Sequence, residues 1–396
     1  MRQLLAVSRL NLAGLAARAG AGSVVVVGIA GAVFVLTALF AMAAGLATTL
    51  TSTGRADRVL ILGGAASSEI NGSITREQIA ILRNAPGIAA IVSGDGLRTP
   101  LASAETYATV NLERSNGRGR AGMPLRGVGA SAFLVRPEVR ITMGRKLVPG
   151  RFEMMVGVGA AEIFQGLAVG DTLSLKGAAF RIVGQFSAGG SATESEAWID
   201  NDVMAGLFTR GGTLSSVLVR LQSPAALATL QRAIDADRRL TNRLFRESDY
   251  YQAQSAAATR MIAAVGVVSG VIMGLGAVFS ALNSLYSAVS ARTREIATLR
   301  ALGFARATVV GSVMVEAMVL ALLGGVLGAM LGWLAFDGVG MASIGATYSQ
   351  VAFHFAVTAR LMLTCVALAL LLGMLGGLLP AVRAARLSVV VGLRPV

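Results

Sequence analysis

ARTREIATLRALGFAR, residues 291–306, is a short basic segment between two long apolar runs, and it organises the rest of the chain. The runs, at 261–289 and 308–336, each exceed the ~20 residues that a helix needs to cross a bilayer core. A segment between two such spans must lie at a membrane face. Its excess of arginine over acid in a short loop predicts that this face is cytoplasmic.

The same segment has the spacing of an amphipathic helix. Ile296, Leu299 and Leu302 or Gly303 fall on one side, while Glu295 lies largely elsewhere. Such a helix, lying across a membrane face, is available to a soluble partner. The alternative from composition alone is a basic surface loop that only fixes the topology of the chain.

The string RTREIATLRALG also carries, without a gap, the pattern R-x-R-E-I-x-x-L-R-A-L-G. This pattern resembles the segment between two spans in FtsX-like, MacB-type ABC transporter permeases, the mechanotransmission class also called type VII. The resemblance implies a coupling helix that docks on a cytoplasmic ABC ATPase. The residues that it assigns to this contact are Arg292, Arg294, Glu295, Ile296, Leu299, Arg300, Leu302 and Gly303.

The composition is that of an integral membrane protein. Of 396 residues, 54% are hydrophobic and only 14% are charged, and the mean hydropathy is +0.68. The net charge of +14 does not indicate a nucleic-acid partner, because it is dispersed arginine and matches no nucleic-acid-binding motif. The single cysteine, Cys365, excludes an intrachain disulfide.

The predicted fold is a membrane protein with four transmembrane helices and a large α+β extracytoplasmic (periplasmic) domain between the first and second. Both termini are predicted in the cytoplasm of a multi-pass bacterial inner-membrane protein. In chain order the predicted segments are a lead-in helix (1–20), a first span (21–50), the outer domain (51–260, with a stalk at 244–260), a second span (261–290), the coupling helix (291–306), a third span (308–336), an outer loop (337–359), a fourth span (360–380) and a cytoplasmic tail (381–396).

The N-terminal region has two interpretations. Residues 1–20 are basic and amphipathic, and the charge-free apolar run that follows is predicted to be an uncleaved span. The alternative is a cleaved signal peptide, since AMAAGLA offers small residues for cleavage. The apolar run is longer than a signal peptide needs and begins far from Met1, which favours the span.

Within the outer domain, turn and cap residues divide short β-like runs from helices. Thr75 and Gln78 form a capping-box pattern, and Ser223 with the following proline starts a second helix. The predicted strands are 88–93, 107–112, 153–158, 172–175, 180–186, 197–199 and 216–221. The stretch 144–186 is similar to the MacB-like periplasmic core domain, and in it Gly166 and Gly170 are turn glycines.

The chain offers few residues for catalysis. It lacks G-x-x-x-x-G-K-[ST], so no cofactor is expected here, and ATP and Mg are expected on the partner ATPase. GRGRAG, 117–122, is a loop because no strand or helix pattern frames it. The paired acids lie in polar sequence and are predicted to be solvated: Glu194/Glu196, Asp200/Asp202 and Asp235/Asp237. The chain is therefore predicted not to be an enzyme.

Glu316 is the one carboxylate well inside an apolar span, where an ionisable group is costly unless it faces protein or water. It is either a proton or substrate contact, or a structural hydrogen-bond partner of a neighbouring helix. MacB-like permeases often carry a similar glutamate, which favours the structural role.

These observations predict the permease subunit of an ABC transporter, with no intrinsic catalytic site. The resemblance implies a homodimer in membrane lipid, an ATPase on each copy, a periplasmic adaptor (membrane fusion) protein, and export of a hydrophobic or lipid-linked compound. The alternatives are an FtsX-like signalling protein that regulates a cell-wall hydrolase, and a membrane scaffold that transports nothing. Gene neighbours discriminate between the three.

Overall fold

The computed structural model describes residues 19–115, 117, 119–208, 212–344 and 350–387. The chain divides into two compact units. The helical unit comprises Met1–Ala44, Arg260–Val339 and Phe355–Val396, and the extramembrane domain comprises Gly45–Thr259 and Gly340–His354. The predicted lead-in helix over residues 1–18 and the end of the predicted tail lie outside the described residues.

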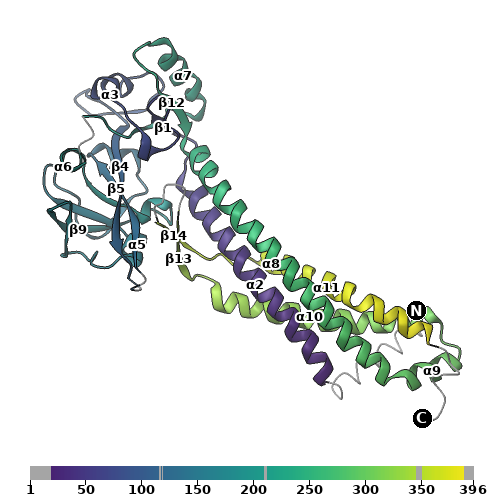
Figure 1. The fold of residues 1–396 in the computed structure, drawn as a ribbon. Coiled ribbons are helices and arrows are strands. Elements are labelled where there is room, and N and C mark those ends of the chain that lie inside the picture. Colours follow the sequence, from purple (N-terminus) through teal and green to yellow (C-terminus); the bar gives the residue numbers. More distant parts are fainter. Residues whose placement is uncertain (1–18, 116, 118, 209–211, 345–349, 388–396) are drawn as a thin grey trace. The chain divides into compact units, whose positions relative to one another are not determined.

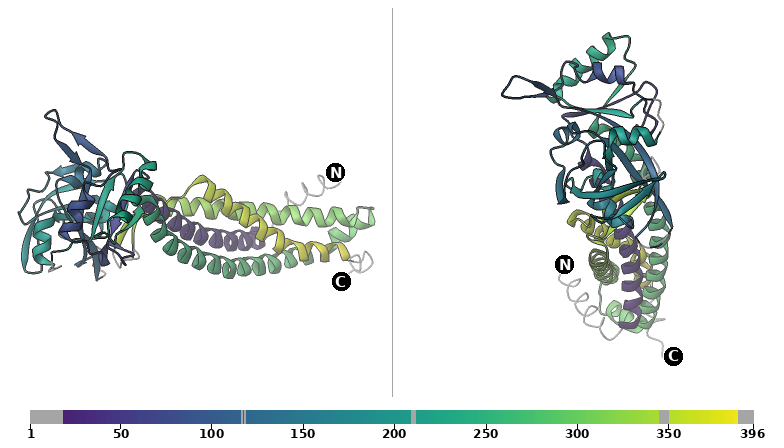
Figure 2. Two further views of the ribbon diagram at one scale, coloured as in Figure 1. Left: turned by 90° about the horizontal axis from the view of Figure 1, so that it is seen from above. Right: turned by 90° about the vertical axis from the view of Figure 1, so that its left-hand side faces the viewer.

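Within the part of the chain that the structure describes, four helices are long and apolar enough to cross a membrane: α2(Ala19–Thr53), α8(Glu247–Ala291), α10(Arg306–Phe336) and α11(Ala359–Arg386). Their membrane portions run side by side in Figures 1 and 2. Two glycines allow close approach. A Cβ on Gly328 of α10 would collide with the carbonyl oxygen of Ala30 on α2, and one on Gly373 of α11 would collide with the Cβ of Ala321 on α10.

Helix α11 is longer than predicted. The sequence placed the end of the fourth span at Pro380, but the helix continues through this proline to Arg386. A proline removes one helical hydrogen bond and usually ends or bends a helix. Here the last turns are retained because Ala381 and Ala384 are fully buried in an apolar cluster with α10 and the short helix α9(Thr293–Ala301).

The extramembrane domain is built on a ten-stranded sheet in the order β12-β1-β11-β4-β5-β10-β7-β9-β6, with β8 paired to β9. Its strands are β1(Arg58–Leu62), β4(Ala102–Glu113), β5(Arg120–Val128), β6(Arg140–Gly144), β7(Glu153–Gly157), β8(Thr172–Leu175), β9(Ala178–Ser187), β10(Ala197–Asp200), β11(Ser216–Arg220) and β12(Arg243–Arg246). A separate hairpin joins β2(Ala90–Val92) to β3(Arg98–Pro100).

The long strand β4 divides this sheet into two lobes. Its residues 102–105 pair with β11, whereas residues 106–113 pair with β5, so the strand changes partner between Glu105 and Thr106. Lobe 1 comprises β12, β1 and β11 with α3(Arg76–Leu82) and α7(Leu227–Ala236), and lobe 2 comprises β5, β10, β7, β9, β8 and β6 with α5(Val158–Ile163) and α6(Asn201–Leu207). Each lobe has its own hydrophobic core, and the two cores share no buried residue.

Most predicted local signals are present in the extramembrane domain. The Thr75 side chain accepts a hydrogen bond from the Gln78 amide, and the Gln78 side chain accepts one from the Thr75 amide, which completes the capping box. Gly166 and Gly170 adopt the left-handed backbone conformation, with φ of 69° and 104°. The predicted stalk at 244–260 needs a correction, because residues 244–246 belong to strand β12 and the helix begins at Glu247.

The loop predicted at 337–359 forms a hairpin of β13(Gly340–Ile344) and β14(Gln350–His354). Although it follows α10, this hairpin packs in the extramembrane domain against α5 and η3(Ala192–Ser195). The Ala352 amide donates to the Ser195 hydroxyl at 2.8 Å, and the Phe353 side chain is buried. The domain is therefore assembled from two separate stretches of the chain.

Candidate coupling site

The predicted coupling segment contains one short helix, α9(Thr293–Ala301). Arg292 separates it from α8 by leaving helical geometry, with φ −102° and ψ 9°. At the other end Gly303 has φ +92° and its amide donates to Arg300, while the Phe304 amide donates to Leu299. This glycine-terminated cap explains why the motif needs a glycine at this position.

The residues predicted to contact an ATPase are divided by burial. Arg294, Glu295, Leu302 and Gly303 are exposed, Leu299 and Arg300 are half-buried, and Arg292 and Ile296 are buried. Leu302 has 72% of its surface exposed, so it does not share the packed side of α9 with Ile296 as the spacing predicted. The exposed four, together with Arg300, form the surface that a soluble partner can reach.

Arg292 and Glu316 form a buried ion pair inside the helical unit. The Nη1 atom of Arg292 donates to Oε2 of Glu316 at 2.9 Å, and both residues are 6% exposed. Glu316 therefore has a hydrogen-bond partner at the junction of α8 and α9, and Arg292 holds the start of α9 against α10. Sequence spacing alone did not predict this pair, because it joins positions 24 residues apart.

A cavity of about 30 Å³ adjoins this pair between α8, α9 and α10. It is lined mainly by apolar side chains, with polar groups from Arg292, Glu295, Ser312 and Glu316. Among the described residues, neither Nε nor Nη2 of Arg292 has a hydrogen-bond partner. The cavity has room for about one water molecule, which is the kind of partner that these donors need.

The outer end of α8 is held inside the extramembrane domain. Glu247, its first residue, is buried and accepts from Nε of Arg58 at 2.6 Å and from the Arg55 amide at 3.0 Å. Three residues on, the Tyr250 hydroxyl accepts from the Glu69 amide at 3.2 Å. Burial raises the pKa of Glu247 although the Arg58 charge opposes this. The helix is thus anchored in lobe 1.

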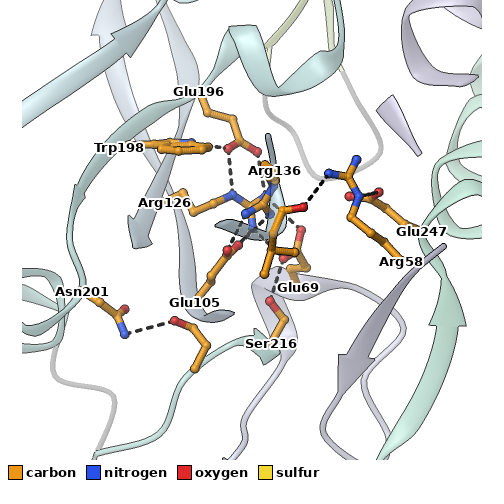
Figure 3. Close-up of polar contacts among 12 residues, drawn as sticks. Arg58, Glu69, Glu105, Arg126, Arg136, Glu196, Trp198, Asn201, Ser216 and Glu247 are labelled. Carbon is orange, nitrogen blue, oxygen red and sulfur yellow. Dashed lines mark hydrogen bonds and ion pairs between the residues drawn. The ribbon is translucent and has the colours of Figure 1, made fainter. Parts of the chain in front are cut away.

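A larger set of buried charges surrounds Arg126 at the boundary of the two lobes (Figure 3). Three carboxylates bind its guanidinium: Glu69 at 2.7 Å, Glu196 at 2.7 Å and Glu105 at 2.9 Å. Burial alone would raise the pKa of Glu105, but the charges of Arg136 and Arg126 outweigh it and lower this pKa to about 2.

Two of the acids predicted to be solvated are therefore buried. Glu196 is 5% exposed and also accepts from the Trp198 indole at 2.9 Å, and Asp200 is 8% exposed and caps helix α6. The prediction was wrong for these two because polar neighbours in sequence do not decide burial, which the sheet pairing imposes. Among the described residues, no group of three or more histidine, cysteine or acidic side chains is arranged to hold a metal ion.

Two family models match this chain along most of its length. The MacB-like periplasmic core domain matches residues 23–237, and the FtsX-like permease C-terminal matches residues 267–389. The chain belongs to the MacB-like and FtsX-like family of ABC transporter permeases. This family assignment agrees with the fold, since the first match runs from α2 through α7 of the extramembrane domain and the second covers most of α8 and all of α10 and α11.

Curated relatives of this family include the "Macrolide export ATP-binding/permease protein MacB" of Nitrobacter winogradskyi. It is 30% identical over 250 residues, which cover 58% of this chain and 36% of the relative. The "Uncharacterized ABC transporter permease YknZ" of Bacillus subtilis is 28% identical over 134 residues, covering 34% of this chain and 32% of that one. The chain thus spans about a third of the length of these relatives.

Solved structures similar to this chain include the periplasmic region of MacB from Actinobacillus actinomycetemcomitans. That comparison has a TM-score of 0.37 and 14% identity, and it covers 51% of this chain and 94% of the other.

Proposed function

We propose that this chain is the transmembrane subunit through which a separate cytoplasmic ATPase moves the extramembrane domain, driving export of a hydrophobic or lipid-linked compound. The observation that carries the proposal is α8, a single helix of 45 residues from Glu247 to Ala291. Its first residue is bound by Arg58 of the extramembrane domain, and its last residue precedes Arg292, which pairs with Glu316. A displacement of α9 can therefore be transmitted along α8, because a continuous helix is stiff.

Inserting four glycines after Ala256 tests this route. Each glycine costs about 1 kcal/mol in a helix, so the insert should interrupt α8 without unfolding a domain of this size. We expect transport in proteoliposomes with the partner ATPase to be abolished while ATP hydrolysis persists. A matched insert of four alanines, which preserves helical propensity, separates added length from lost stiffness. Full transport by the glycine variant would refute transmission through α8.

The proposed ATPase contact is the exposed surface of α9. Substituting Glu295→Gln together with Arg300→Gln should reduce co-purification of the ATPase and the stimulation of its activity. Expression should be unchanged, because neither side chain is buried in the apolar cluster below α9. Glu77→Gln with Arg83→Gln, an exposed charge of α3 and one on the residue that follows this helix, provides the control. Unchanged coupling in the α9 variant would remove this contact from the proposal.

A homodimer is supported by the outward surface of α8. This helix is the least buried of the four spans, with 17% of its apolar window buried against 28–44% in the others. Exposed apolar residues recur along it at alternating spacings of four and three: Met261, Val265, Val268, Ile272, Leu275 and Phe279. This spacing is typical of paired helices. Ile272→Cys in a Cys365→Ser background should cross-link two copies in membranes, whereas Leu363→Cys, exposed on α11, should not.

A hydrophobic cargo is supported by a groove of about 350 Å³ in the helical unit. Its lining is wholly apolar and comes from α2, α8 and α11. Such a surface accepts an acyl chain or another apolar group and offers nothing to a polar solute. A periplasmic adaptor would then receive the cargo on the outer side, as part of the same proposal.

The orientation in the membrane follows from the positive charge of the α9 segment. In a Cys365→Ser background, Arg120→Cys should react with an impermeant thiol reagent added outside, and Thr298→Cys should react only after permeabilisation. Both parent residues are exposed, so access depends on the side of the membrane alone. Labelling of residue 298 from outside would overturn the coupling proposal with it.

A further inference from the structure

We infer that Arg126 and Glu69 form an ionic joint that sets the position of the two lobes and ties that position to the outer end of α8. This inference rests on the proposed function and names the residues that would receive the movement of α8. The ionic joint consists of Arg126, Glu69, Glu105 and Glu196, with Tyr250 as its link to α8 (Figure 3 shows the first four).

The ionic joint lies where β4 passes from lobe 1 to lobe 2. Glu105 is the last residue of β4 that pairs with lobe 1, and the next residue pairs with lobe 2. Arg126 comes from β5 and Glu196 directly precedes β10, both in lobe 2, whereas Glu69 precedes α3 in lobe 1. One guanidinium therefore binds a carboxylate from each lobe and one from the shared strand.

The connection between the lobes is polar at the crossing of β4. The main apolar clusters of lobe 1 and lobe 2 have no buried residue in common, and an apolar contact between the lobes comes from the segment after β5, where Val135 packs with Leu60 and Leu218 of lobe 1. The shared strand and the charged contacts at its crossing add a directional connection to this apolar one. A buried ion pair adds little stability over a well-packed apolar pair, but its directional bonds define one geometry. Arg126 makes two bonds to Glu69 and two to Glu196, which fixes both carboxylate planes.

Tyr250 links the ionic joint to α8. The Tyr250 ring is buried and its hydroxyl accepts from the backbone of Glu69, the same residue whose carboxylate binds Arg126 and the Ser216 hydroxyl. A displacement of the first turn of α8 would therefore reach Glu69 through the Tyr250 contact. From Glu69 it reaches lobe 2 through a single guanidinium. Tyr250 is a positioning residue in this scheme, because it acts through Glu69.

The experiment measures the distance between the lobes in the full-length protein in nanodiscs. Spin labels are placed on exposed residues of each lobe, by Arg83→Cys and Ala168→Cys in a Cys365→Ser background. Without the ATPase, Glu69→Gln should broaden the distance distribution at least twofold. The matched control is Glu153→Gln, a lobe 2 carboxylate that binds Arg145 away from the ionic joint, and it should leave the distribution unchanged. A folded Glu69→Gln protein with the wild-type distribution would overturn the ionic joint.

The second measurement adds the partner ATPase with ATP. Wild type should shift its distance between the lobes, and Tyr250→Phe, which keeps the ring and every buried charge, should lose at least half of that shift with little change in melting temperature. A full shift in Tyr250→Phe overturns the link to α8. No shift in wild type refutes the proposed function instead, and the resting distributions of Glu69→Gln still decide whether the ionic joint exists.

Discussion

The buried charges of the extramembrane domain and those of the helical unit are built in different ways. In the domain, Arg58 donates to Glu247 and Glu138 and also contacts the carbonyl oxygens of Val135 and Thr53. In the helical unit, Arg292 donates only to Glu316 among the described residues, and a cavity adjoins its remaining nitrogens. Each guanidinium nitrogen of Arg58 thus has a partner, whereas two nitrogens of Arg292 have none among the described residues and have room to rearrange.

This difference matches what each region has to do in the proposed mechanism. A buried guanidinium whose nitrogens are all hydrogen-bonded holds one geometry, because every alternative position leaves a buried donor without a partner. A pair beside a small polar cavity can shift and take a water molecule in exchange. In the proposed mechanism the outer end of α8 is therefore held in one position, whereas the start of α9 can change its position.

The largest expected effect is the loss of Arg58. Arg58→Met leaves Glu247 buried without its charged partner, and removing one member of a buried pair costs about 3–5 kcal/mol. Thermal unfolding of the full-length protein in detergent should show this loss. Arg145→Met, which removes a half-exposed arginine from Glu153, should cost about 1 kcal/mol or less. Equal losses of stability in the two variants would show that the buried and the surface ion pair contribute equally.

Acid should destabilise the extramembrane domain more than the helical unit. The pKa of Glu105 falls from 4.5 to about 2 on folding, so this carboxylate stabilises the domain above pH 4.5. That contribution, about 3 kcal/mol, is lost as pH falls from 4.5 toward 2. Glu247, whose pKa is raised, acts in the opposite sense, and its contribution is lost as pH rises through its folded pKa. Melting temperatures from pH 5 to 2.5 should fall less steeply in Glu105→Gln.

Loss of the ion pair between Arg292 and Glu316 should reduce stability less than loss of Arg58, and a second substitution should restore most of that stability. Arg292→Met removes one charged hydrogen bond and should cost about 2 kcal/mol, because the adjoining cavity lets water reach Glu316. Adding Glu316→Gln should recover most of this loss, measured as resistance of the helical unit to heat in detergent. A second substitution cannot do the same for Arg126, which serves three carboxylates. If the double variant did not recover stability, Arg292 and Glu316 would be bound as fully as Arg58 is, and the contrast between the two regions would be wrong.

The smallest expected loss of stability is that of the capping residue of α3, and it serves as a reference for the other variants. Thr75→Ala removes the capping side chain of α3 and should cost about 1 kcal/mol, as cap losses do. The cap contains no buried charge, so the loss should not change between pH 7 and pH 4. If the cost of Thr75→Ala varied with pH as that of Glu105→Gln does, the pH effect would not be specific to the buried charges.

The sequence predicted the spans and the position of α9 because each depends on local patterns. Hydropathy identifies the four helices, and the motif glycine, Gly303, ends α9. Strand β5 was missed because Gly122, Pro124 and Gly127 interrupt the alternation that marks a strand. Its residue Arg126 is the centre of the ionic joint, so the missed strand also concealed that cluster. Contacts between distant positions, such as the pair of Arg292 and Glu316, leave no trace in a local pattern.

Strands β13 and β14 have a consequence for how the protein is made. They belong to the extramembrane domain, yet they are synthesised only after α8, α9 and α10, about 80 residues beyond the end of the first stretch of that domain. Until this hairpin has been synthesised, Ser195 lacks its backbone donor from Ala352 and the surface beside Gly159 is uncovered. The extramembrane domain is therefore completed only after α10 has been made, and a chain that stops before the hairpin would lack part of the fold of that domain.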